Sequence, residues 1–127
     1  MSAQASTLSR IRLELAREPG HPAGDPRHGY EIVAPLGDEG RLDPELWRKD
    51  RGACSVHRFR PGEPAEIGRL ARKPGGAWYF DYDSDSTADD EAGFRFGDER
   101  FVPGEYVSIR ENDGKMHTFR VISVEPL

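Results

Sequence analysis

Apolar and polar residues alternate along several short stretches of this chain. The clearest stretch is residues 10–15, where Ile11, Leu13 and Leu15 are separated by charged residues. This period of two is the signature of a β-strand with one buried face. The same reasoning, helped by β-branched and aromatic residues, predicts further strands over residues 30–36, 53–60, 65–73, 77–82, 93–96, 105–110 and 116–124.

Turn-forming residues separate these stretches. Residues 16–29 are so dense in Pro and Gly that neither a helix nor a central strand would tolerate them, which predicts a long loop. Asp113-Gly114 lies between two alternating runs and predicts a hairpin. The buried face switches from Phe119 and Val121 to Ile122 and Val124. A β-bulge near Val121 or burial on both faces would explain this switch.

The sequence predicts the start of one helix near residue 43. Asp43 suits an N-cap, Pro44 suits the first helical position, and Glu45 complements the positive end of the helix dipole. Leu46 and Trp47 would hold this short helix against the sheet. The pattern predicts about two helical turns, near residues 43–49.

The complete pattern predicts an all-β fold, a small barrel-like or sandwich antiparallel sheet of about 6–8 short strands with this one short helix. We expect residues 1–7 to form a flexible tail and residues 8–127 to form a single β domain. The expected core consists of Ile11, Leu13, Leu15, Ile32, Leu46, Trp47, Val56, Ile67, Trp78, Phe80, Val107, Ile109, Phe119 and Val121.

Composition limits the classes of function. The single cysteine, Cys54, excludes an intramolecular disulfide framework. The sequence shows no basic-then-apolar leader and no apolar run near the roughly 18 residues of a spanning helix, so we expect a cytoplasmic protein with no membrane contact. The net charge of −5 makes general nucleic-acid binding unfavourable, because that affinity comes mainly from Lys and Arg meeting phosphates.

An acidic stretch over residues 81–91 is the most specific candidate for a binding site, here for a divalent cation. Its acids recur at alternate positions, as in calcium-binding loops that deliver several oxygens to one point. Ser86 replaces the glycine that such loops use for their turn, and Glu91 comes one position too early for the bidentate ligand. The alternative is a solvated hairpin tip. The candidate ligands of Ca²⁺ or Mg²⁺ are Asp81, Asp83, Asp85, Asp89 and Glu91; no other cofactor is indicated.

The Pro- and Gly-rich loop offers a second candidate site. Long loops in compact domains are often functional, and His21, Arg27 and His28 could contact a ligand or partner. The alternative is an ordinary surface loop stiffened by its prolines. Catalysis there would require a pocket that brings His21 or His28 against a carboxylate.

A third alternative is weak binding of single-stranded nucleic acid. Small barrels bind such strands with aromatic residues beside a basic groove. Residues 48–73 contain eight Lys and Arg against three acids, whereas residues 81–105 contain nine acids against two arginines. A basic-aromatic face would use Arg58, Arg60, Arg69, Arg72, Trp78 and Tyr79.

These observations favour a small intracellular binding or interaction module without catalytic activity, whose partner is a protein or a small ligand. The divalent-cation site and the nucleic-acid face are the alternatives. The sequence contains no nucleophile elbow, phosphate loop or metal-ligand spacing that would indicate an enzyme. Nothing in it specifies an oligomeric state.

Overall fold

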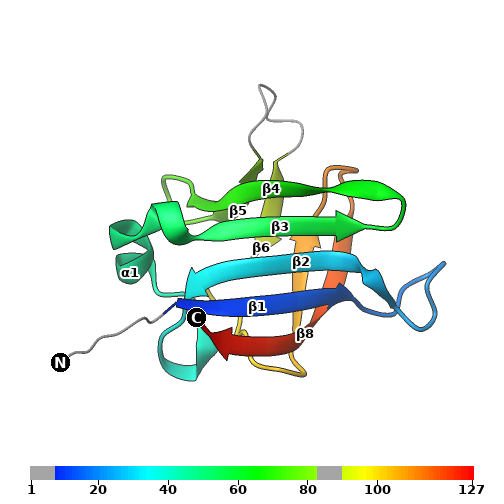
Figure 1. Cartoon of the computed structure of the whole chain (residues 1–127), viewed down its shortest axis with the longest axis horizontal. Coiled ribbons are helices and arrows are strands. Elements are labelled where there is room, and N and C mark those ends of the chain that lie inside the picture. The colour runs from blue at the N-terminus through cyan, green and yellow to red at the C-terminus, as the bar shows by residue number, and fades with distance from the viewer. Residues whose placement is uncertain (1–7, 83–89) are drawn as a thin grey trace.

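The computed structural model of this chain describes residues 8–82 and 90–127. These residues form a closed antiparallel barrel of eight strands (Figure 1). Each strand pairs with the next along the chain, and the last pairs with the first. The strands are β1 (Leu8–Leu15), β2 (Asp25–Pro35), β3 (Ser55–Arg60), β4 (Glu63–Arg72), β5 (Trp78–Tyr82), β6 (Glu91–Phe94), β7 (Tyr106–Arg110) and β8 (Met116–Pro126). The predicted all-β barrel is therefore confirmed. The predicted tail of residues 1–7 lies outside the described residues.

The barrel closes between β1 and β8 through an irregular register. Ile11 pairs with Val124 and Leu13 pairs with Val121, so β8 carries one extra residue between them. Ile122 occupies this β-bulge region and is 38% exposed, whereas Val121 is buried. The predicted bulge near Val121 thus accounts for the switch of faces.

The short helix α1 (Pro44–Lys49) follows β2, with 3-10 turns before it at Asp38–Gly40 and after it at Arg51–Ala53. The Asp43 side chain accepts hydrogen bonds from the backbone N–H groups of Glu45 and Leu46, as an N-cap does. The Trp47 indole donates to the Leu70 carbonyl at 2.9 Å and packs edge-to-face on Trp78. The helix expected near residues 43–49 is confirmed.

The interior of the barrel is filled by aliphatic and aromatic side chains. Twelve of the fourteen expected core residues are buried. Two expectations are wrong: Ile67 is 59% exposed on the outer face of β4, and Leu46 is only half-buried. Buried hydrophobic residues absent from the expected core are Tyr30, Ala34, Leu42, Cys54, Leu70, Tyr82, Phe96 and Phe101.

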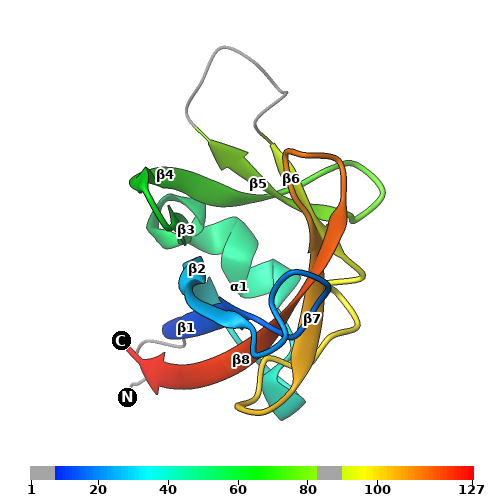
Figure 2. The same ribbon diagram turned by 90° about the vertical axis from the view of Figure 1, so that its right-hand side faces the viewer.

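The two ends of the barrel are different. Helix α1 and the turn between β4 and β5 lie at one end, whereas the β1–β2 loop and the β3–β4 turn lie at the other (Figures 1 and 2). The β1–β2 loop is shorter than predicted, because β2 begins at Asp25 rather than at Tyr30. Because of this extension His28 lies on β2, and its side chain points toward the buried Glu111.

Candidate functional site

The end of the barrel opposite α1 contains a buried polar cluster built around Glu91. This carboxylate, on β6, has a fully buried side chain. It accepts hydrogen bonds from the Tyr30 hydroxyl at 2.8 Å and from the Tyr82 hydroxyl at 2.9 Å. Arg58 and Arg60 donate to it at 3.3 and 2.8 Å, and the backbone N–H of residue 112 donates at 3.1 Å. Glu91 is therefore a fully engaged buried anion.

Glu111 is a second buried carboxylate, just after β7. Its side chain is 3% exposed, and the Tyr30 hydroxyl lies 2.5 Å from Oε2. His28 Nε2 lies 3.0 Å and Arg60 Nη2 lies 3.2 Å from the same oxygen. Burial alone would raise the pKa of Glu111, but the hydrogen bonds from His28 and Tyr30, with the charges of His28 and Arg60, lower it below its usual value.

Tyr30 links the two carboxylates. A phenol has one proton, so Tyr30 can donate a full hydrogen bond to only one of Glu91 and Glu111 at a time. Burial and the two negative charges raise the pKa of Tyr30 well above its ordinary value, so the hydroxyl keeps its proton. The charges of Arg58 and Arg60 balance those of the two carboxylates, which is the condition for burying them.

His117 lies at the outer edge of this cluster. Its Nδ1 is 3.0 Å from Glu18 and its Nε2 is 3.0 Å from Asp113. Because carboxylates only accept hydrogen bonds, both contacts are satisfied only when the ring is protonated. Burial alone would lower the pKa of His117, but the bonds to Asp113 and Glu18 outweigh it and raise the pKa.

His28, Arg60, Glu111 and His117 of this cluster line a hollow of about 280 Å³. Its described lining contains five carboxylate residues, three histidines and one arginine, namely Glu18, Asp25, Glu63, Glu111, Asp113, His21, His28, His117 and Arg60. The charge of Arg60 is already matched by the buried carboxylates. Two buried nitrogens of this lining, His21 Nδ1 and Arg60 Nε, have no hydrogen-bond partner among the described residues. The hollow thus has an excess of carboxylates, and two of its nitrogens have unused hydrogen-bonding capacity.

The structure separates the three residues proposed from the β1–β2 loop. His28 lies against Glu111, and its ring packs 5.7 Å from that of Phe119. His21 also lines the hollow, with Nδ1 3.8 Å from Glu18. Arg27 has a side chain that is 77% exposed and contacts Asp25 instead. His28 therefore meets the geometric condition of a histidine against a carboxylate, whereas Arg27 lies outside the hollow.

The candidate cation site falls partly outside the described residues, which do not include Asp83, Asp85 and Asp89. Asp81 is exposed on β5, and Glu91 points into the barrel beside Phe80, its register partner. Asp81 and Glu91 thus lie on opposite faces of the sheet. Among the described residues no group of three or more His, Cys, Asp or Glu is arranged to hold a metal. Cation binding by residues 81–91 stays a prediction.

The proposed basic-aromatic face does not form as one surface. Arg58 and Arg60 point inward and bind Glu91, with the Arg58 guanidinium stacked on the Tyr82 ring. Trp78 is only 3% exposed. Arg69 and Arg72 belong to β4, and Arg72 covers the Trp78 ring at the α1 end of the barrel. These residues therefore do not share one surface: Arg58 and Arg60 lie in the interior, Arg69 is exposed on β4, and Arg72 lies at the α1 end. Single-stranded nucleic-acid binding itself stays a prediction.

Sequence reasoning missed the roles of Tyr82, Glu111 and His117. It also assigned no role to Tyr30 and expected Arg58 on a basic surface. A signal was present, because Arg58 follows Val56 at the strand period and must share its buried face. A charged residue at an inward position needs a buried partner of opposite charge.

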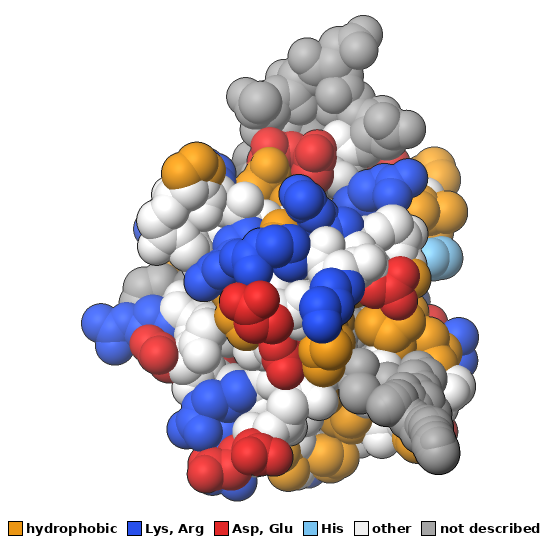
Figure 3. Space-filling model, turned by 90° about the vertical axis from the view of Figure 1, so that its left-hand side faces the viewer, with side chains coloured by type: hydrophobic (Ala, Val, Ile, Leu, Met, Phe, Trp, Pro, Cys, Tyr) orange, Lys and Arg blue, Asp and Glu red, His pale blue; other side chains and the backbone are white. Residues whose placement is uncertain are grey.

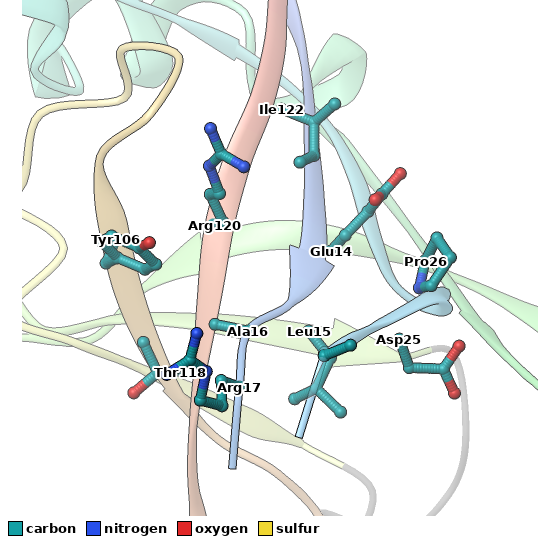
Figure 4. Close-up of a pocket in the computed structure, with 11 residues that line it drawn as sticks. Glu14, Leu15, Ala16, Arg17, Asp25, Pro26, Tyr106, Thr118, Arg120 and Ile122 are labelled. Carbon is teal, nitrogen blue, oxygen red and sulfur yellow. The ribbon is translucent and has the colours of Figure 1, made fainter. Parts of the chain in front are cut away.

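A larger hollow of about 790 Å³ lies on the outer surface of the barrel. Figure 4 shows Tyr106, Thr118 and Arg120 projecting from β7 and β8 beside Glu14 of β1 and Asp25 of β2. Its lining contains two acids and two arginines, so its formal charges balance. It lacks the excess of carboxylates found at the polar end.

Comparisons with known proteins do not add a function. No family model, curated protein or solved structure matches this chain. None of the helices in residues 8–82 and 90–127 combines the length and apolar character needed to cross a membrane.

Proposed function

We propose that this protein is a non-catalytic binding module that takes a small cationic ligand at the polar end of the barrel. The excess of carboxylates in the hollow carries this proposal. Arg58 and Arg60 neutralise Glu91 and Glu111, and the exposed Arg27 contacts Asp25. Within the described residues, Glu18 and Asp113 form ion pairs with histidines alone, and Glu63 forms none. A concave site with an excess of one charge attracts ligands of the opposite charge.

The size and rigidity of the hollow support a small ligand rather than a protein segment. The volume of about 280 Å³ is just below the range for drug-sized ligands, roughly 300–1,000 Å³, which favours a smaller ligand. Its walls are tied together across the barrel, since Arg60 contacts Asn112 at 3.2 Å and Glu18 contacts His117. Preorganised walls reduce the entropy cost of binding. An ammonium ligand would place its donors against carboxylate oxygens.

The test is a ¹⁵N–¹H NMR titration with three molecules of the same length: 1,4-diaminobutane, 1,4-butanediol and succinate. The proposal expects saturable shifts at residues around the hollow with the diamine, and no saturation with the diol or the dicarboxylate. Equal responses to all three, or no saturable shift with the diamine, would refute it.

A matched pair of variants on β4 tests the location. Glu63 lines the hollow, whereas Glu66 is exposed three residues further along and does not line it. Glu63→Gln should weaken diamine binding about 2–5-fold, the equivalent of about 0.5–1 kcal/mol for one partly exposed charge pair. Glu66→Gln should change it less than that. Equal weakening in both variants would mean that binding follows net charge and not this site.

The protonation of His117 gives the proposal a pH signature. The charged groups facing His117 are Glu18 from the β1–β2 loop and Glu111 and Asp113 from the β7–β8 turn, with His28 of β2 beside it. As pH rises through the raised pKa of His117, the ring loses its positive charge. Affinity for the diamine should therefore increase over this range, and His117→Gln should flatten the profile. A profile that stays unchanged in this variant would contradict the assignment.

A further inference from the structure

The opposite end of the barrel carries a cluster of cations that the cationic-ligand proposal does not use. A hollow of about 470 Å³ lies between α1 and the turn that joins β4 to β5. It is lined by Trp47, Arg48, Arg51, Arg72 and Lys73, with residues 74–76 completing the wall. The described lining contains no Asp or Glu. Figure 3 faces the α1 end and shows Lys and Arg side chains gathered over its middle.

Three of these cations are held in place by aromatic rings. The Arg51 guanidinium lies 5.2 Å from the Trp47 ring centroid, and that of Arg72 lies 5.3 Å from the Trp78 centroid. The Lys73 ammonium lies 5.3 Å from the Tyr79 centroid. Such cation–π contacts restrict the side chains without neutralising their charge.

The positive charge of this cluster is largely uncompensated. Arg48 pairs with Glu45 at 3.0 Å, but no described carboxylate forms an ion pair with Arg51, Arg72 or Lys73. Arg72 Nε donates to the Gly76 carbonyl at 3.3 Å, which leaves its charge unpaired. In a chain with a net charge of −5, three unpaired cations around one hollow are a local reversal of sign.

The turn glycine contributes space. A Cβ at Gly76 would lie 3.1 Å from Arg72 Nη2, and Gly76 has a φ of +101° that side chains rarely adopt. A glycine at this position therefore leaves room for the Arg72 guanidinium to lie against the turn. The hydrogen bond to the Gly76 carbonyl and the contact with the Trp78 ring hold the guanidinium at the wall of the hollow.

We propose that this hollow is a second binding site, for a small phosphate monoester. Guanidinium groups match the oxygens of phosphate in paired hydrogen bonds, and a lysine adds a point charge. Trp47 is 6% and Trp78 is 3% exposed, and arginines cover both rings. Nucleobases therefore have no free tryptophan face to stack on, which distinguishes this site from a single-strand binding groove.

The experiment is a ¹⁵N–¹H NMR titration of the full chain with phenyl phosphate and, separately, inorganic phosphate. Chloride keeps the ionic strength constant. We expect saturable shifts around residues 47–51 and 72–76. A parallel titration uses a short single-stranded oligonucleotide without terminal phosphates. Stronger saturable binding of the oligonucleotide than of phenyl phosphate would overturn the proposal, and so would the absence of saturable shifts at millimolar phosphate monoester.

Charge-removing variants locate the site. Arg72→Gln and Lys73→Gln should each weaken phenyl phosphate binding at least fivefold. Arg41→Gln is the control, because Arg41 is exposed, pairs with Glu39 and does not line this hollow. It should change affinity less than twofold. Lys73 lies on the turn and is not buried, so its variant keeps the test valid if Arg72→Gln impairs folding. If all three variants lose affinity for phenyl phosphate equally, binding depends on the net charge of the protein and not on this hollow, which would refute the site.

Discussion

The buried carboxylate of Glu91 allows a quantitative test of the polar cluster. Glu91→Gln keeps the shape of the side chain but removes its charge and replaces one acceptor oxygen with an amide donor. Arg58 and Arg60 then face one buried carboxylate instead of two. The Tyr30 and Tyr82 hydroxyls donate to Glu91 Oε1, whereas Arg58, Arg60 and the backbone N–H of residue 112 donate to Oε2. In either orientation of the amide, one of these two sets of donors faces an NH2 group that cannot accept.

The expected cost follows from the burial of these groups. Removing one partner of a buried ion pair costs about 3–5 kcal/mol, because the other charge stays buried without compensation. The Glu91 side chain is fully buried, and Arg58 and Arg60 are only 7% and 13% exposed, so water screens them little. The unfolding free energy of such a domain is about 5–15 kcal/mol. Glu91→Gln should therefore remove a large share of the stability.

Urea unfolding followed by tryptophan fluorescence measures this effect, since Trp47 and Trp78 are both buried. With a slope of about 2 kcal/mol per molar urea, a loss of about 4 kcal/mol moves the midpoint down by about 2 M. The control is Glu66→Gln, which removes a carboxylate 4.0 Å from Arg58 whose side chain is 57% exposed. Glu66→Gln should lower the free energy of unfolding by less than about 1 kcal/mol.

One outcome would refute the reasoning. If Glu91→Gln and Glu66→Gln shift the midpoint equally with unchanged slopes, the buried charges of Arg58 and Arg60 do not depend on Glu91. In that case water or rearranged side chains would replace the Glu91 carboxylate as the acceptor for these arginines.

Three further outcomes follow from individual residues. Gly29→Ala should lower the melting temperature by several degrees, since its Cβ would overlap the Leu13 carbonyl oxygen in the β1–β2 ladder; a shift of under 2 °C would contradict this. Burial raises the pKa of Cys54 to about 11, so a thiol-specific reagent at pH 8 should label it only after unfolding, and rapid native labelling would show otherwise. The raised pKa of His117 stabilises the fold below the unfolded pKa of 6.5, and this contribution is lost as pH rises through the folded pKa. The stability difference between the wild type and His117→Gln should therefore shrink from pH 6 to pH 9, and a constant difference would exclude the linkage.

The fold was predictable because its signals are local. Alternation over residues 10–15 defined β1, and Asp113-Gly114 defined the β7–β8 turn. The change of face after Val121 indicated a bulge, which the β1–β8 register contains. Ile67 shows the limit of this reasoning: it lies on β4, but on the face that turns to solvent. The apolar residues of a strand do not by themselves say which of its faces will turn toward the barrel interior.

The polar cluster was not predictable because its contacts are distant in sequence. Tyr30 meets Glu91 across 61 positions and Glu111 across 81. Glu91 was grouped with the acids before it, although β6 turns its side chain into the barrel. Only the closed order of strands, with β1 against β8, brings these side chains to one end.

The position of the buried charges argues that they serve more than stability. Replacing a buried ion pair with apolar residues is often neutral or stabilising, so stability alone does not require one. Here the charges lie at one end of the barrel, and the remaining interior is apolar. From that end Glu91 binds both the β3 arginines and the backbone of the β7–β8 turn. The network therefore fixes the walls of a negative hollow, which is the arrangement that a preorganised site for a small cation requires.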